Sequence, residues 1–286
     1  MERRTGIATV AALVLALGTP AVMAQDETGW THTAELSYVA TDGNSEATSL
    51  GLSDLSRRQW AKSRFTVKLD AIRAETTDVV DRFAIETPPS VVTIEETTTT
   101  AERYLVEARY DRNISEKLFW FAGTSWDRNR PSGIEDRYQG FAGVGNIWWD
   151  TDDLKFRTDY AVSYTDQTDV VVDPAADDSF VGLRFSWEYR NKFGESTQYG
   201  NDFIVDYSLD ESDDWRMDMT NFVAVAMNKR LALKVSLQFL YDHMPPRDLI
   251  PVFDMDPNAG GTQTGTTFFE KDDLDTIFKA GLVVNF

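Results

Sequence analysis

The feature that most constrains this chain is a series of long segments in which apolar and polar residues alternate one by one. Between residues 180 and 190, Leu183, Phe185 and Trp187 share one parity, and Arg184 and Glu188 share the other. Successive side chains of a β-strand point to opposite faces. Each such segment is therefore predicted to be a strand with one apolar face and one charged face.

Twelve segments carry this alternation. They cover residues 30–41, 47–57, 63–73, 98–110, 117–127, 137–148, 154–165, 180–191, 197–209, 215–227, 230–241 and 273–286. Most exceed the five or six residues typical of soluble strands and suit a tilted transmembrane strand. An even strand count is the rule for single-chain outer-membrane barrels. The predicted fold class is all-β, an antiparallel up-and-down transmembrane β-barrel of about 12 strands (10–14).

The connections between these segments alternate in length. Those after every second segment are short, whereas 74–97, 128–136, 166–179 and 242–272 are longer. Short periplasmic turns and long outer loops are typical of such barrels. Segment 242–272 is rich in proline and glycine, and we expect it to fold over or into the barrel mouth.

Aromatic residues gather near the expected strand ends, as an interfacial girdle requires. The inner set is Trp30, Trp60, Trp120, Trp148, Trp149, Tyr189 and Phe286, and the outer set is Trp126, Tyr138, Tyr164, Trp215 and Tyr241. A soluble β-sandwich or a lipocalin-like barrel would also alternate, but its apolar face would look inward. The strand lengths favour the membrane.

The first 24 residues have the pattern of a cleaved signal peptide. Arg3 and Arg4 precede an apolar run, and a small-residue site ends at Ala24. The predicted organisation is a signal peptide over 1–24 and a barrel domain over 25–286, exported to the cell outer membrane. Removal of the signal changes the formal net charge from −19 to −20, because Glu2, Arg3 and Arg4 leave with it. So acidic a chain lacks the basic footprint that nucleic acid requires, and we expect no nucleic-acid partner.

The charged parity of the strands supplies the candidate site. Nine lumen-facing charged residues are the candidates: Lys155, Arg157, Asp159, Arg184, Glu188, Asp202, Asp206, Arg216 and Asp218. The same parity also predicts seven further charged residues to face the lumen: Lys68, Asp70, Glu107, Arg109, Arg190, Lys234 and Lys279. In diameter, a twelve-stranded barrel is intermediate between small barrels, which side chains fill, and large barrels, which contain a channel. These charges could neutralise one another in a plug or line a narrow solute path.

Both ends of the chain resemble known outer-membrane proteins. The ending Gly281-Leu282-Val283-Val284-Asn285-Phe286 is similar to their last strand, which the barrel-assembly machinery reads, and the resemblance makes Leu282, Val284 and Phe286 the assembly signal. The opening, with Trp30 and then Thr41-Asp42-Gly43-Asn44-Ser45, resembles the family called domain of unknown function 481, putative salt-induced outer-membrane proteins. This resemblance implies an outer-membrane barrel and no settled chemistry.

No catalytic, cofactor or metal site is predicted, and the chain is not expected to be an enzyme. A hydrolase would have to use His243, because the only other histidine, His32, lies near the inner rim, and no serine partner is evident. Acidic clusters at 210–214, 173–178 and 254–258 could hold Ca²⁺, but none has the twelve-residue calcium-loop pattern.

Three kinds of function are compatible with the sequence. The first is a narrow porin-like channel or envelope component, the second is a structural or interaction barrel without conductance, and the third is an outer-membrane lipid hydrolase. The expected partners are outer-membrane lipid and lipopolysaccharide, the barrel-assembly machinery and periplasmic chaperones. Small solutes or divalent cations are further candidates.

Overall fold

A computed structural model describes residues 29–41, 45–84, 90–172, 178–211, 213–254 and 262–285. The predicted signal peptide and Phe286 lie outside these residues. The strands are β1 (Gly29–Thr41), β2 (Ser45–Trp60), β3 (Ser63–Ala84), β4 (Ser90–Asn113), β5 (Leu118–Asn129), β6 (Ile134–Asp150), β7 (Leu154–Asp169), β8 (Ser179–Phe193), β9 (Thr197–Ser208), β10 (Trp215–Ala226), β11 (Leu231–Asp242), β12 (Arg247–Phe253), β13 (Gln263–Glu270) and β14 (Leu274–Asn285). Over the described ranges, no helix is long and apolar enough to cross a membrane.

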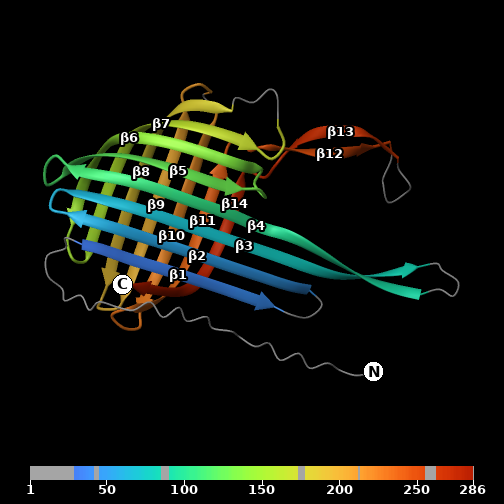
Figure 1. Ribbon diagram of the computed structural model, residues 1–286, viewed down its shortest axis with the longest axis horizontal. Coiled ribbons are helices and arrows are strands. Elements are labelled where there is room, and N and C mark those ends of the chain that lie inside the picture. Colours follow the sequence, from blue (N-terminus) through green and yellow to red (C-terminus); the bar gives the residue numbers. More distant parts are fainter. Residues whose placement is uncertain are drawn as a thin grey trace.

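Twelve of these strands close into one antiparallel barrel (Figure 1). Each strand pairs with its neighbour in sequence, except that β11 pairs with β14 because β12 and β13 form a separate two-stranded sheet. The ring is completed where β14 pairs with β1. The predicted up-and-down barrel of twelve strands is therefore confirmed, and each barrel strand overlaps one predicted segment.

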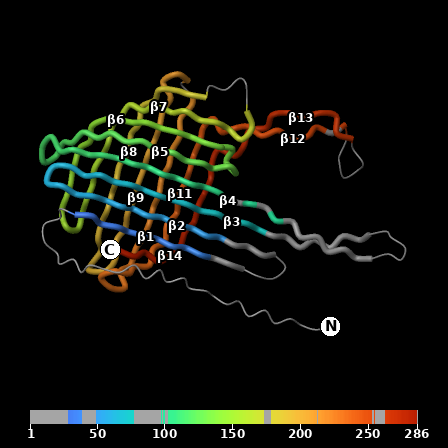
Figure 2. Tube along the Cα trace, viewed as in Figure 1, coloured from blue at the N-terminus to red at the C-terminus, as the bar shows by residue number. Residues whose placement is uncertain are grey.

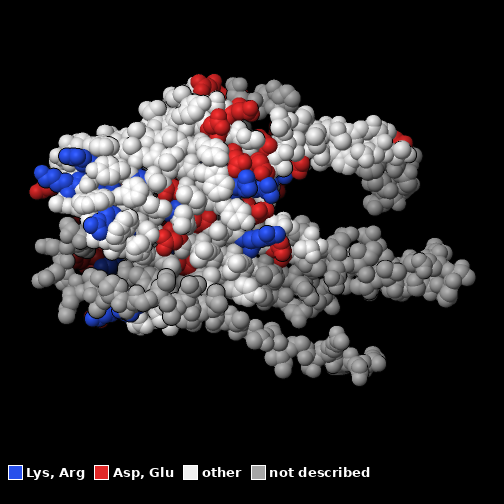
Figure 3. Space-filling model, viewed as in Figure 1, with Lys and Arg blue, Asp and Glu red and all other residues white. Residues whose placement is uncertain are grey.

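The barrel has its apolar residues outside and its polar residues inside. In β7, Asp159, Ser163 and Thr165 are at most 4% exposed, whereas Tyr160 and Val162 are 50% and 55% exposed. Much of the visible barrel wall in Figure 3 consists of uncharged residues. This is the reverse of a soluble barrel, and it matches a barrel whose outer band lies against lipid.

The connections expected at 74–97 and 128–136 are much shorter than predicted. β3 continues to Ala84 and β4 starts at Ser90, so most of the first segment is a long hairpin (Figure 1). Beyond the bilayer both faces of a hairpin meet water, so a strand there does not need to alternate. The second segment shrinks to a turn over 130–133, in which Gly133 has a φ of 93°.

The described part of segment 242–272 does not fold into the barrel, so that half of the prediction is wrong, whereas the base of the segment does lie at the mouth. Its strands β12 and β13 extend from the same end of the barrel as the β3–β4 hairpin (Figure 1), and every residue of β13 is exposed. Only its base lies at the mouth, where the backbone amide of Lys271 donates to the carbonyl of Pro246 at 3.3 Å, and Ser132 is hydrogen-bonded to Asp275.

Candidate functional site: the charged lumen

Two ion pairs cross the full width of the barrel. Arg57 on β2 lies 3.5 Å from Glu188 on β8, and Arg103 on β4 lies 3.4 Å from Asp218 on β10. In the ring of twelve, β2 and β8 are six strands apart, as are β4 and β10. Opposite strands can meet only through the interior, so these side chains face the lumen and span it at two levels.

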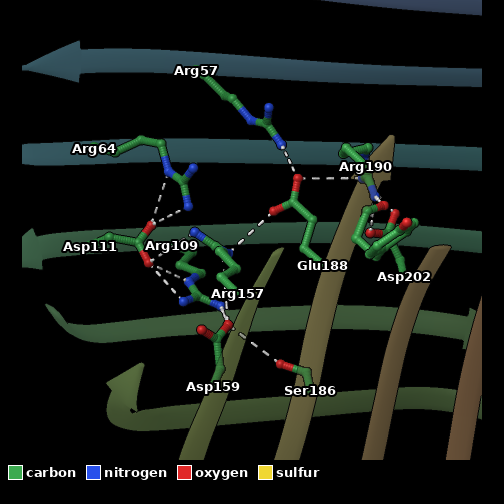
Figure 4. A network of polar contacts seen from close by, with 11 residues as sticks. Arg57, Arg64, Arg109, Asp111, Arg157, Asp159, Ser186, Glu188, Arg190 and Asp202 are labelled. Carbon is green, nitrogen blue, oxygen red and sulfur yellow. Dashed lines mark hydrogen bonds and ion pairs between the residues drawn. The ribbon is translucent and has the colours of Figure 1, made fainter. Parts of the chain in front are cut away.

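A denser cluster fills the half of the lumen nearer the short turns (Figure 4). We call it the lumen network, and its members are Arg57, Arg64, Arg109, Asp111, Arg157, Asp159, Glu188, Arg190 and Asp202. Its five arginines exceed its four carboxylates by one positive charge. These residues come from β2, β3, β4, β7, β8 and β9, so the network ties together strands around half of the ring.

Three of the four carboxylates of the lumen network, Asp111, Asp159 and Glu188, are shared between arginines, whereas Asp202 pairs with Arg190 alone. Glu188 forms ion pairs with Arg57 at 3.5 Å, Arg157 at 3.3 Å and Arg190 at 3.4 Å. Arg109 bridges two carboxylates, at 2.6 Å from Asp159 and 2.7 Å from Asp111. Arginine suits this position because its planar fork contacts several carboxylate oxygens at once.

Phenylalanines of β5 and β6 also lie inside the lumen, beside the network. Phe119, Phe121 and Phe141 are 2%, 1% and 6% exposed. The guanidinium carbon of Arg109 lies 3.8 Å from the centre of the Phe121 ring, which is cation–π geometry, and Arg184 lies 4.6 Å from Phe141. The aromatic faces help to hold the arginines in place in a region partly shielded from water.

The half of the lumen nearer the long loops contains a polar cavity of about 120 Å³, which we call the vestibule. Its lining includes Arg103, Arg137, Arg184, Asp206, Arg216 and Asp218, together with the base of the β12–β13 hairpin at Pro245 and Pro246. Arg184 holds Asp206 at 2.8 Å, and Arg216 lies 3.1 Å from Asp242. In the loop beside this mouth, burial raises the pKa of Asp214 in spite of the nearby Arg216.

Eight of the nine candidate residues lie in these contacts. Arg157, Asp159, Glu188 and Asp202 belong to the lumen network, and Arg184, Asp206, Arg216 and Asp218 line the vestibule. Lys155 does not join them, because its side chain is 60% exposed at the short turn and pairs with Asp150 at 3.4 Å.

Several lumen residues were not among the predicted candidates, chiefly Arg57, Arg64, Arg103, Asp111 and Arg137. Their parity was a usable signal, since Arg137 alternates with the outward Tyr138, which is 55% exposed. The sequence also contains a signal for the phenylalanines that point into the lumen. The run Leu118 to Ala122 is apolar at every position, which indicates a strand buried on both faces.

Each histidine has a side-chain partner at its Nδ1 atom. The Nδ1 atom of His32 lies 2.7 Å from Ser56 Oγ, but that hydroxyl donates to Asp54 at 2.6 Å, so the acid does not orient the imidazole as in a catalytic triad. His243 Nδ1 lies 3.0 Å from the Tyr241 hydroxyl and stacks against Trp215.

No group of three or more His, Asp or Glu among the described residues is placed to hold a metal ion. Much of the acidic clusters at 173–178 and 254–258 falls outside those residues. The Ca²⁺ hypothesis therefore stays untested for them.

The fold and the lumen together define a class of protein: a transmembrane β-barrel with an apolar exterior and an ion-paired polar interior. A family model described as "Protein of unknown function, DUF481" matches residues 34–252. The chain belongs to this family, as the resemblance of its opening predicted.

Solved barrels of similar topology are distant in sequence. A NanC porin structure has a TM-score of 0.47 and 10% identity, covering 88% of this chain and 98% of that one. A KdgM porin in complex with disordered oligogalacturonate has a TM-score of 0.41 and 9% identity, with coverages of 89% and 99%. An anion-selective porin from Comamonas acidovorans has a TM-score of 0.38 and 9% identity, with coverages of 90% and 98%. Among curated proteins, none matches the chain.

Proposed function

We propose that this protein is a narrow outer-membrane channel for small hydrophilic solutes, with the lumen network as its constriction. The observation that carries the proposal is the filling of the lumen by charged side chains that reach across it, such as Arg57 and Glu188. Buried ion pairs add little net stability compared with apolar residues of similar volume. A barrel that served only as a scaffold would gain more from an apolar core, so the retained charges point to passage of hydrated solutes.

The constriction consists of side chains and not of an inserted loop. Glu188 and Arg57 are 23% and 34% exposed, so water reaches the pair that spans the lumen. Because side chains form the constriction, a rotamer change of Arg57 or Glu188 would widen the path without any change in the strands.

Several expectations from the sequence complete this proposal. Residues 1–24 would be removed as a signal peptide, and the barrel would lie among lipopolysaccharide after delivery by periplasmic chaperones and the barrel-assembly machinery. Two observations support the proposed role of the last strand in assembly. Leu282 is exposed on the outer face, and Leu282 and Val284 pair with Leu36 and Ala34 of β1. Induction by salt and an affinity of the acidic loops for divalent cations remain predictions.

A solute-swelling assay with proteoliposomes tests the channel. Liposomes with the refolded protein should swell in small sugars and not in larger ones. The charge-balanced variant Arg57→Ser with Glu188→Ser removes the pair that spans the lumen, and we expect it to admit larger sugars. Lys155→Ser with Asp150→Ser is the matched control, because this pair lies at an exposed turn. If neither the parent protein nor the variant Arg57→Ser with Glu188→Ser admits any sugar, the protein is better described as a non-conducting interaction barrel.

A further inference from the structure

The barrel wall is incomplete at one place, between its first and last strands. β1 pairs with β14 only from Thr33↔Asn285 to Leu36↔Leu282. On its other side, β14 pairs with β11 along eleven residues, and β1 pairs with β2 along thirteen. Continuation of the same register would place Ser37 opposite Gly281 and Thr41 opposite Ile277, but these pairs are absent although all four residues are described.

The two strands separate in the direction of the long loops. In Figures 1 and 2, β14 rises steeply alongside β11, whereas β1 continues with β2. Unpaired backbone amides and carbonyls in hydrocarbon cost several kcal/mol each, which is why barrels are normally closed all round. An open edge of this length in an otherwise complete ring therefore needs a reason.

The point of separation is built from small residues. Gly281 lies so close to β1 that a Cβ on it would be 2.7 Å from the carbonyl oxygen of Leu36 and 3.2 Å from the Cβ of Ser37. On the other side of β1, a Cβ on Gly51 would be 2.3 Å from the Ser37 hydroxyl. Two glycines thus let β1 pass its neighbours closely at Ser37, and beyond this point β1 and β14 diverge.

Two ion pairs bridge this seam from the lumen side. Lys234 of β11 reaches Glu35 of β1 at 2.6 Å, past β14, and Lys279 of β14 reaches Asp70 of β3 at 2.8 Å, past β1 and β2. Ser53 of β2 also donates to Asp70, at 2.7 Å. Both lysines lie on the C-terminal side of the seam and both acids on the N-terminal side. Side chains therefore hold together the two edges that backbone pairing leaves apart.

We propose that the seam between β1 and β14 is a lateral gate, clasped by Glu35–Lys234 and Asp70–Lys279, through which an amphipathic, lipid-like molecule passes between the lumen and the bilayer. A water-soluble solute has no need of an opening into hydrocarbon. A molecule with a polar headgroup and an apolar chain can place the headgroup among the charges of the lumen while its chain stays in the membrane. This gate does not depend on the solute channel proposed above.

Disulfide trapping tests the geometry of the seam, and the native chain has no cysteine to interfere. The test pair is Tyr38→Cys with Ala280→Cys, two exposed positions that the extended register would place opposite each other. The control pair is Ala34→Cys with Val284→Cys, which are paired in the structure. Cα atoms of paired strands lie within disulfide range. In lipid vesicles we expect the control to oxidise rapidly and the test pair slowly and incompletely; equal rates would overturn the gate.

Labelling by a reactive lipid tests passage through the seam. The probe is a phospholipid with a maleimide on its headgroup, applied to folded protein in vesicles. Ile277→Cys has the lumen-facing parity of Lys279 on the open edge of β14, and Ser125→Cys faces the vestibule on the distant strand β5. We expect the lipid to label Ile277→Cys much faster. Equal labelling would mean entry through the mouth, and no labelling of either would mean no lipid access; each result would overturn the proposal.

The clasp is tested by charge exchange in the Ile277→Cys background. Lys234→Met and Lys279→Met should each increase lipid labelling several-fold, because each removes one bridge across the seam. The double variant Glu35→Lys with Lys234→Glu restores an ion pair in which the two charges have exchanged strands. Its labelling should return to the rate of the Ile277→Cys protein. Retention of a compact unboiled band on gels confirms that each variant is folded. Labelling that does not respond to the clasp variants would contradict the assignment of these pairs.

Discussion

Replacing Glu188 with glutamine removes a carboxylate that three arginines share while preserving the shape of the side chain. Arg57, Arg157 and Arg190 lie 3.3–3.5 Å from it. Each such pair has a Coulomb energy of about 4 kcal/mol at the effective dielectric constant of a protein. Much of this is offset by desolvation, and removal of one partner from a buried pair typically costs about 3–5 kcal/mol.

Because Glu188 is 23% exposed to lumen water, we expect Glu188→Gln to lower the free energy of unfolding by about 3 kcal/mol, toward the low end of that range. Urea unfolding of the refolded protein in lipid vesicles measures this directly. Asp150→Asn is the matched control, since its pair with Lys155 is about 60% exposed and should contribute less than about 1 kcal/mol. A loss for Glu188→Gln no larger than that of the control would refute the reasoning that the lumen network is buried and coupled.

Three further predictions test the packing and the membrane face. Phe121→Ala should lower the free energy of unfolding by about 3–5 kcal/mol, measured in the same urea assay, because its ring is 1% exposed. Gly145→Val should prevent normal folding, seen as loss of the compact unboiled band on gels, because its Cβ would lie 2.1 Å from a phenylalanine ring; Gly140→Val, with open space around it, should fold. Leu183→Arg should cost about 2–4 kcal/mol if this exposed position faces the bilayer core, whereas Leu209→Arg, beyond the end of β9, should cost at most about 1 kcal/mol, and equal costs would contradict a membrane-embedded wall.

The strands of the barrel could be predicted from the sequence because the membrane imposes a strict rule on them. A strand with lipid on one side and a wet lumen on the other must alternate, so β8 and β14 are recognisable from their residues alone. The rule lapses outside the bilayer. The outer ends of β3 and β4 and the hairpin β12–β13 therefore resembled loops, and their strand character depends on pairing that a single sequence does not reveal.

The residues that face the lumen could be predicted from the sequence, but the contacts between them could not. Parity identified Arg157, Asp159 and Glu188 as inward residues, and the up-and-down order implies that strands six apart lie opposite each other. The height at which two opposite residues meet depends on the stagger of the whole ring, which local sequence does not determine. For this reason the pair Arg57–Glu188 emerged only from the structure.

The incomplete seam was also beyond the reach of sequence reasoning. Ser37 and Gly281 belong to segments that alternate as regularly as any other, and nothing in them indicates that pairing stops there. The extent of pairing between the first and last strands depends on how the remaining strands tilt and close. It is a property of the ring and not of either strand.

Single-channel recording of the refolded protein in a planar lipid bilayer tests the central claim most directly. If the lumen network is a constriction in a solute path, the protein should show small openings whose conductance rises with salt, and the variant Arg57→Ser with Glu188→Ser should show larger ones. Absence of openings at any salt concentration, from protein that retains a compact unboiled form on gels, would contradict the channel.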